Sequence, residues 1–230
     1  MKPRFVANEI YHIYNRGVEK RNIFVNDNDR FRFIHDLYEF NDESPALNIY
    51  YKFPPGQSYE VQLRKMVEQR KKELRKPLVE ILVFCLMENH YHLLMRQNSE
   101  NGIVRFMQKL GTGYTNYFNT TYERVGPLFQ GRFKAVLIEK ESHLLHMPFY
   151  IHANPLDIIF SGWKEKKFNF EKAIIFLNTY RWSSYLDYAG KKNFPSVIQS
   201  EFLIDYFKGN YKKEMHAWLI NIYSEISFES

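Results

Sequence analysis

The chain has 230 residues, 45% of them apolar, and its 32 lysines and arginines outnumber 26 aspartates and glutamates to give a formal net charge of +6. This apolar fraction supports a sizeable core and excludes an intrinsically disordered protein. Aromatic residues make up 17% of the chain. Rings that stack on bases and basic side chains that follow phosphates suit a single-stranded nucleic acid, whereas mild basicity alone also serves solubility.

Cysteine usage and the N-terminus indicate the compartment. Cys85 is the only cysteine, so no internal disulfide can form, which is typical of cytosolic proteins. Residues 1–5 lack the apolar core of a secretion signal, and no apolar run reaches the length of a membrane span. We expect a cytoplasmic protein that does not enter a membrane.

Hydrophobic periodicity predicts seven elements in the first two thirds of the chain. Four are strands, at residues 9–16, 79–87, 90–95 and 133–139. Three are helices, whose expected N-terminal caps are Asp27 or Asn28 for the first, Ser99 or Asn101 for the second, and Ser142 for the third. The third helix should end near Asn154, because proline follows it and disfavours helix in the preceding residue. The first six elements have the order βαββαβ, which predicts an α+β fold with a ferredoxin-like antiparallel sheet and two helices on one face.

Two stretches lie outside this core of residues 1–160. Residues 58–76 form a basic segment, expected to be helical, within an insertion at about residues 42–77. Charge runs of this kind are usually exposed faces, and a DNA-contacting arm is the alternative. Residues 161–230 are aromatic and irregular, and we expect a C-terminal helical extension. In the long helix, Gly111 and Gly113 each cost about 1 kcal/mol relative to alanine and are a candidate kink.

The sharpest local feature is the tripeptide of His90, Tyr91 and His92. Residues i and i+2 of a strand point to the same face, so the two imidazoles would project side by side, as a shared divalent metal requires. A chance pair of packing or surface histidines is the alternative. No further cysteine or histidine follows at zinc-finger spacing, so any metal site must recruit a ligand from a distant segment.

A second feature is the pair of Tyr150 and Asn154 on the third expected helix. Residues four apart lie on one helical face, so a tyrosine nucleophile and an amide oxygen ligand would be neighbours there. The alternative is a core tyrosine followed by an ordinary Asn-Pro helix stop. Tyr114 and Tyr117 lie on the apolar stripe of the long helix, where core packing is expected.

Several sequence blocks resemble those of one known family, the REP-associated tyrosine transposases of the single-tyrosine His-hydrophobic-His superfamily. The blocks occur in the family's order at residues 11–17, 86–95, 126–134, 150–155 and 180–185. The resemblance spans about residues 5–190 and implies a ferredoxin-like catalytic core. It also implies a transposase-like enzyme that cleaves and rejoins single-stranded or hairpin DNA with a divalent metal.

By position, the resemblance assigns roles to four residues. His90 and His92 match the metal-binding histidines, and Asn154 stands where relatives have a polar residue that completes the metal shell. Tyr150 matches the nucleophile. The expected DNA contacts are Arg16, Arg105, Lys109, Arg132 and Lys134. One departure is Glu88, which replaces the family's usual proline and is expected to bring a carboxylate near the metal.

The implied nucleophile is a phenol that must be activated, because only about one free tyrosine in a thousand is ionised at neutral pH. A metal would polarise the phosphate, and attack by Tyr150 would leave a 5′-phosphotyrosine and a free 3′-hydroxyl. Nitrogen and oxygen ligands without thiolate favour Mg²⁺ or Mn²⁺. The partner is DNA, and a homodimer is compatible with the sequence. Two rival functions are a catalytically inactive nucleic-acid-binding regulator of the same fold and a metal phosphodiesterase that uses water.

Overall fold

The computed structural model describes residues 5–44, 75–165 and 168–228, without the side chains of residues 223–228. The basic segment expected at residues 58–76 therefore lies outside the described residues except for Arg75 and Lys76, which are not helical. Among the described residues, no helix has both the length and the apolar character needed to cross a bilayer.

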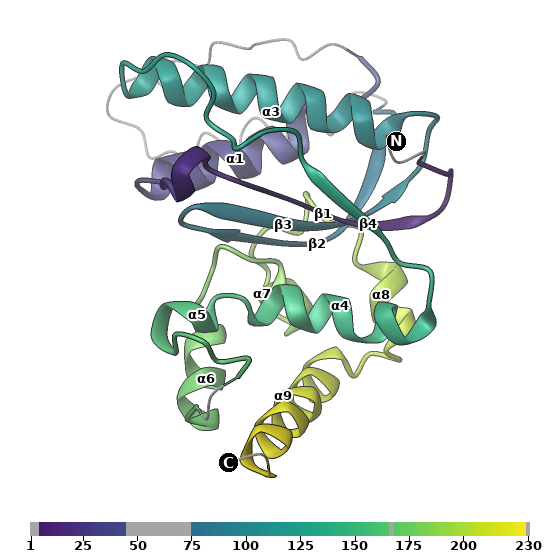
Figure 1. Ribbon diagram of the computed structural model, residues 1–230. Coiled ribbons are helices and arrows are strands. Elements are labelled where there is room, and N and C mark those ends of the chain that lie inside the picture. Colours follow the sequence, from purple (N-terminus) through teal and green to yellow (C-terminus); the bar gives the residue numbers. More distant parts are fainter. Residues whose placement is uncertain (1–4, 45–74, 166–167, 229–230) are drawn as a thin grey trace.

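In the part of the chain that the structure describes, a four-stranded sheet lies at the centre (Figure 1). Its strands are β1 (Ile10–Arg16), β2 (Val79–Met87), β3 (His90–Gln97) and β4 (Lys134–Leu137). The strand order is β2-β3-β1-β4, and all three neighbouring pairs are antiparallel. This order and the sequence of elements confirm the predicted ferredoxin-like fold.

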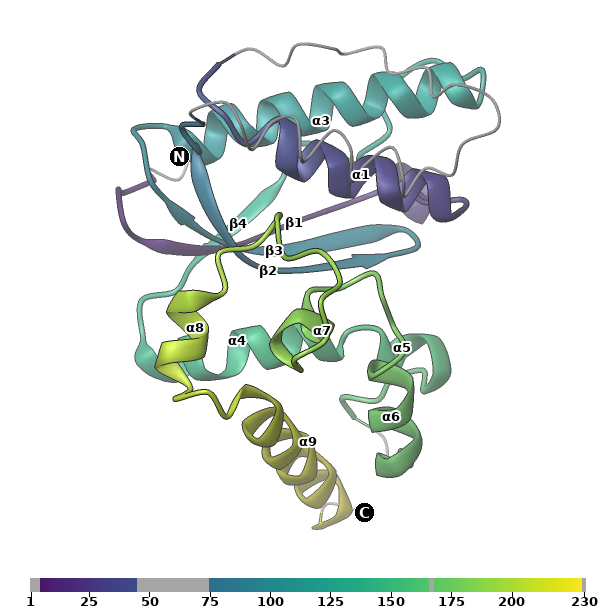
Figure 2. The ribbon, with the colours of Figure 1, turned by 180° about the vertical axis from the view of Figure 1, so that it is seen from behind.

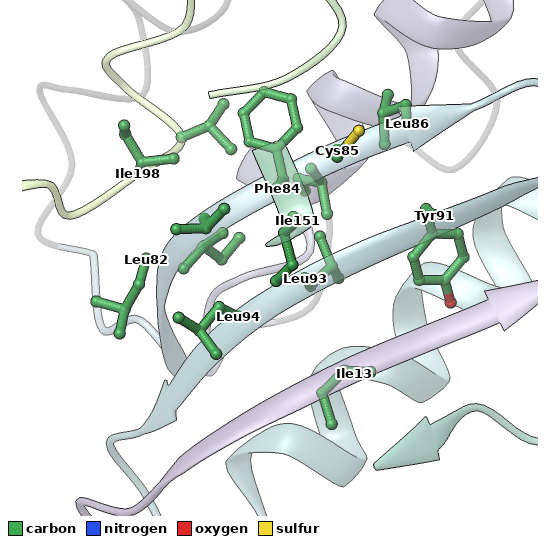
Figure 3. Packing of buried hydrophobic residues seen from close by; sticks show 14 of the residues in the cluster. Ile13, Leu82, Phe84, Cys85, Leu86, Tyr91, Leu93, Leu94, Ile151 and Ile198 are labelled. Atoms are coloured by element: carbon green, nitrogen blue, oxygen red, sulfur yellow. The ribbon is translucent and has the colours of Figure 1, made fainter. Parts of the chain in front are cut away.

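Two long helices, α1 (Asp27–Glu39) and α3 (Gly102–Thr121), cover one face of the sheet (Figure 1). The ring of Phe33 on α1 packs 4.9 Å, centroid to centroid, from the ring of Tyr91 on β3. Figure 3 shows Tyr91 and Leu93 of β3 in the apolar core together with Ile13 of β1. The predicted pair of helices on one face is therefore confirmed.

Two helix starts differ from the expected ones. Helix α1 is capped by Asn26 rather than Asp27 or Asn28, because the Asn26 side chain accepts from the amide of Asp29 while the Asp29 side chain accepts from the amide of Asn26. Helix α4 (Glu141–Ala153) follows Lys140 without a side-chain cap, so Ser142 lies inside the first turn. The C-cap of α4 is Asn154, as expected from the proline that follows.

The second face of the sheet is covered by α4, and the helices that follow α4 lie on the same side of the sheet (Figures 1 and 2). A short 3-10 helix at Val18–Lys20 directly follows β1 and is not part of this layer. The helices that follow α4 are α5 (Leu156–Ile159), α6 (Phe170–Leu177), α7 (Tyr185–Tyr188), α8 (Glu201–Tyr206) and α9 (Tyr211–Phe228). Strand β2 is tied to the C-terminal part by backbone bonds, which run from the Leu86 amide to Trp182 O and from the Ser184 amide to Phe84 O. The C-terminal helices thus contribute directly to the packing around the sheet.

His152 joins three elements of this second layer. One of its ring nitrogens lies 2.6 Å from the Tyr211 hydroxyl at the start of α9, and the other lies 2.8 Å from the Ser184 hydroxyl before α7. The side chain is fully buried. Burial lowers the pKa of His152 from 6.5 to about 3, so this imidazole is neutral in the folded protein.

We predict that His152 makes the protein less stable as pH falls. The unfolded chain takes up a proton near pH 6.5, whereas the folded chain takes it up only near pH 3. The free energy of unfolding therefore falls between these values, with a contribution from this residue of about 1.4 kcal/mol per pH unit. Urea denaturation from pH 7 to pH 4 should give a smaller slope for His152→Gln than for the parent. His143→Gln, on the exposed face of the same helix, is the control and should keep the parent slope.

The two glycines of α3 have different surroundings, although α3 runs through both without a break. A Cβ atom added at Gly113 would lie 2.4 Å from two ring carbons of Phe40, whereas a Cβ at Gly111 would meet nothing within 4 Å. Phe40 is itself buried, at 3% exposure. Gly113 therefore permits a close approach between α3 and the end of α1, and Gly111 has no such role.

Replacement of each glycine by alanine should thus have opposite effects. Gly111→Ala should raise the free energy of unfolding by up to about 1 kcal/mol through helix propensity. Gly113→Ala should lower it by about 1–3 kcal/mol through overpacking. Urea titrations of both variants, and of Gly113→Ala in a Phe40→Leu background, measure these effects. A penalty at Gly113 that is not reduced in the Phe40→Leu background would contradict the steric explanation.

Candidate functional site

The candidate site lies on the sheet face that is covered by α4. Strands β1 and β3 pair so that Tyr14 lies opposite His92 and Arg16 lies opposite His90. Because side chains alternate along a strand, these four residues share one face. The rings of His90 and His92 are 5.1 Å apart, centroid to centroid. The structure thus brings together the two histidines that the sequence singled out.

His12 is a third histidine in this site, and it was not among the candidates from the sequence. Its Nε2 atom lies 2.8 Å from Nδ1 of His92, and the two rings are stacked with centroids 5.0 Å apart. The sequence carries one signal for it, since His12 alternates with Tyr14 and Arg16 along the first strand. Its contact with His92 depends on the pairing of β1 with β3. The periodicity of a single strand does not predict which strands pair.

The hydrogen bond at His90 selects the ring nitrogen that a ligand would meet. Nδ1 of His90 lies 2.7 Å from Oδ1 of Asn89, and Nδ2 of Asn89 donates to the carbonyl of Lys20. The amide oxygen of Asn89 can only accept, so Nδ1 of His90 donates and Nε2 carries the lone pair. At His92, Nε2 carries the lone pair when Nδ1 donates to His12. In metal sites, a hydrogen bond from the other ring nitrogen orients each ligating histidine in this way.

Burial keeps these imidazoles neutral. It lowers the pKa of His90 to about 4, and the charges of Arg16 and Lys164 lower it further. Burial also holds the pKa of His92 well below 6.5, with further contributions from His12, His90 and Lys164. The neutral imidazole is the form that binds a metal ion.

Tyr150 reaches the same site from α4. Its ring centroid is 6.2 Å from that of His92 and 6.5 Å from that of His12. The side chain is half-buried, and its hydroxyl accepts a hydrogen bond of 2.9 Å from Nζ of Lys164. Asn154 lies one helical turn further on, is buried, and donates from Nδ2 to the carbonyl of Tyr150 over 2.8 Å. The i, i+4 spacing thus does make Tyr150 and Asn154 neighbours.

Other tyrosines differ in how their hydroxyls are used. Tyr114 donates to the carbonyl of Ile23, and Tyr117 donates to the carboxylate of Asp29, both in the helical layer on the other side of the sheet. Tyr14 is the exception, because it is half-buried within the candidate site and its ring lies 5.8 Å from that of His92. By position, Tyr14 is thus a second candidate for the nucleophile, which the sequence did not single out.

The donor set decides whether a divalent metal fits here. Within the described ranges, no group of three or more histidine, cysteine, aspartate or glutamate side chains is arranged to hold a metal ion. Glu88, expected to bring a carboxylate to the metal, therefore forms no such group with the two histidines. Two neutral imidazoles and the amide oxygen of Asn154 are nitrogen and oxygen donors without thiolate, which fits Mg²⁺ or Mn²⁺. Such a set leaves coordination positions for phosphate oxygens.

The five basic residues expected to contact DNA fall into two groups. Arg16 and Lys134 flank Tyr14, Arg16 on the same strand and Lys134 directly opposite it on β4, and the exposed Arg132 precedes β4. Arg105 and Lys109 lie on α3, across the sheet from Tyr150. They donate to backbone carbonyls of residues 42–44. The structure therefore brings only the first group near the candidate site.

Part of the chain matches a known protein family. Residues 56–154 match the family model described as "Transposase IS200 like", and this segment contains both candidate histidines and Tyr150. This segment is therefore similar to the IS200-like transposases, in agreement with the resemblance to single-tyrosine transposases noted from the sequence.

Among solved structures, the chain is similar to one described as a REP-associated tyrosine transposase bound to a REP hairpin. The TM-score is 0.49 and the sequence identity 11%, over 87% of this chain and 91% of that chain. No curated protein matches the chain.

The contact between His12 and His92 predicts an effect on metal affinity. If Nδ1 of His92 donates to His12, loss of that acceptor leaves the His92 ring without the hydrogen bond that fixes its orientation and its tautomer. His12→Ala should weaken Mn²⁺ binding by about 10- to 100-fold, and His12→Gln, which keeps an acceptor, should weaken it less. Isothermal titration calorimetry measures both affinities, with His143→Ala as the control. Unchanged Mn²⁺ affinity in His12→Ala would rule out the orienting role.

Proposed function

We propose that the protein cleaves and rejoins single-stranded or hairpin DNA through a covalent bond between Tyr150 and the 5′-phosphate of the broken strand. One observation carries this proposal. The half-buried Tyr150 lies beside the rings of His12 and His92, and its hydroxyl is met by a lysine ammonium rather than by a structural acceptor. A tyrosine in this setting is suited to nucleophilic attack.

The reaction conserves bond energy and needs no nucleotide cofactor. Oη of Tyr150 forms a bond to phosphorus while the bond from phosphorus to O3′ breaks. The phenolic proton is lost to solvent and the departing O3′ takes up a proton, which leaves a 5′-phosphotyrosine and a free 3′-hydroxyl. In the rejoining step a 3′-hydroxyl attacks the phosphotyrosine and releases the phenol. The covalent intermediate therefore stores the energy needed for strand transfer.

The metal would be held by His90, His92 and Asn154. When bound, a hard divalent cation polarises a phosphate oxygen and stabilises the charge of the transition state. The two histidines are suited to this because burial keeps their imidazoles neutral. Asn89 orients His90 and Asn154 stays beside Tyr150 through its hydrogen bond. Mg²⁺ and Mn²⁺ are the ions that this set of donors favours.

The DNA partner is supported by charge near the site. Arg16 lies opposite His90, and among the described residues no hydrogen-bond partner meets its buried Nε atom. A phosphate oxygen is a suitable acceptor for that group. Lys134 and Arg132 extend the positive surface along the edge strand β4. Their role in DNA binding, and a cytoplasmic location for the enzyme, are part of the proposal.

The test is whether a covalent adduct forms on Tyr150. Labelled hairpin DNA is incubated with the protein and Mn²⁺, and protein–DNA adducts are separated on a denaturing gel. Tyr150→Phe removes one oxygen and almost no volume, so DNA binding should persist while adduct and cleavage fall to background. Tyr14→Phe is the matched control, since Tyr14 lies in the same site, and it should keep both activities.

The same assay separates the rival functions. A phosphodiesterase that uses water would still cleave DNA with Tyr150→Phe, and a binding regulator would cleave with no variant. An adduct lost with Tyr14→Phe and kept with Tyr150→Phe would assign the nucleophile to Tyr14 and overturn the assignment of Tyr150.

A further inference from the structure

Lys164 is held next to Tyr150 by the packing of its own segment, which connects α5 with α6. Its neighbour Trp163 is buried at 1% exposure and packs against Trp218 of α9 with ring centroids 6.2 Å apart. Backbone bonds from the Trp163 amide to Phe160 O and from the Glu165 amide to Gly162 O form a compact turn around it. Gly162 takes a φ of 74° in this turn, a value that favours glycine. The backbone of Lys164 is thus anchored although its side chain is exposed.

Two contacts join Lys164 to Tyr150. Nζ of Lys164 donates to Oη of Tyr150 over 2.9 Å, and the same atom lies 4.3 Å from the centroid of the Tyr150 ring. One ammonium therefore contacts both the hydroxyl oxygen and the ring of Tyr150.

We propose that Lys164 is a catalytic residue whose ammonium stabilises negative charge on the phenolic oxygen of Tyr150. This role rests on the proposed function of the site. During cleavage the charge develops as Oη loses its proton and attacks phosphorus. During rejoining the charge returns to Oη as the bond from Oη to phosphorus breaks. In this role Lys164 acts as a hydrogen-bond donor to Oη, while the phenolic proton is exchanged with solvent in both directions.

The contact has the features of electrostatic catalysis. The donor is in place before charge develops, so little reorganisation is needed when the phenolic oxygen becomes anionic. Removal of one such donor from a buried site costs about 100- to 1,000-fold in rate. Lys164 is exposed, so solvent screens its charge and a smaller effect, about tenfold, is expected here. Because the same oxygen is nucleophile in cleavage and leaving group in rejoining, both steps should slow.

The experiment compares three variants under single-turnover conditions with saturating hairpin DNA and Mn²⁺. Lys164→Met keeps a long stem but removes the charge, Lys164→Arg keeps the charge, and Lys172→Met removes a charge from the exposed face of α6 as the matched control. Lys164→Met should slow adduct formation about tenfold, and it should slow rejoining from the purified adduct by a similar factor. Lys164→Arg should recover most of the rate, and Lys172→Met should stay within about twofold of the parent.

Each result decides between catalysis and a surface role. DNA affinity should fall at least as much in Lys164→Met as in Lys172→Met, because each loses one positive charge and Lys164 lies beside the proposed phosphate position, so the rates are compared at saturating DNA. A parent-like rate for Lys164→Met, or an equal loss of rate in Lys172→Met, would overturn the role of Lys164 while leaving that of Tyr150 intact. A parent protein that forms no adduct would overturn the proposed function itself, and the role of Lys164 with it.

Discussion

The antiparallel pairing of β1 with β3 determines which side chains meet in this molecule. Its register sets Tyr14 opposite His92 and Arg16 opposite His90. Because side chains alternate along a strand, all four lie on the sheet face that α4 covers. A slip of one residue would turn the β1 side chains to the helical face and remove His12 from His92. The pairing is protected on both sides, because β1 and β3 are the two inner strands of the sheet. The site thus rests on the most constrained part of the fold.

The second helical layer positions Tyr150 and lowers the pKa of the histidines on the sheet face that α4 covers. Helix α4 brings Tyr150 to the histidines, and His152 two residues later anchors the same helix to α7 and α9 through two hydrogen bonds. The layer also withdraws water from His12, whose pKa burial lowers to about 4. The C-terminal residues are therefore needed for the site even though the family match ends at residue 154. Their anchoring of Lys164 through Trp163 is a second contribution of this kind.

Much of the fold could be predicted from the sequence, because strands and helices leave periodic apolar patterns that burial enforces. The i, i+2 spacing likewise determines that His90 and His92 share one face of a strand. The i, i+4 spacing determines that Tyr150 and Asn154 share one face of a helix. The contributions of His12 and Lys164 could not be predicted in this way. Both depend on contacts between residues far apart in the chain, at separations of 80 residues for His12 and His92 and 14 for Tyr150 and Lys164. Local periodicity carries no information on such contacts.

Positive charge dominates the site before any substrate arrives. The charges of Arg16 and Lys164 act on His90, and the charge of Lys164 also acts on His92. A phosphodiester brings one negative charge per nucleotide and would relieve the mutual repulsion of these cations. The same repulsion disfavours protonation of the histidines and thus preserves their lone pairs. A site of this composition favours an anionic group, and under the proposed function a phosphate bound there would supply the atom that the adjacent phenol attacks.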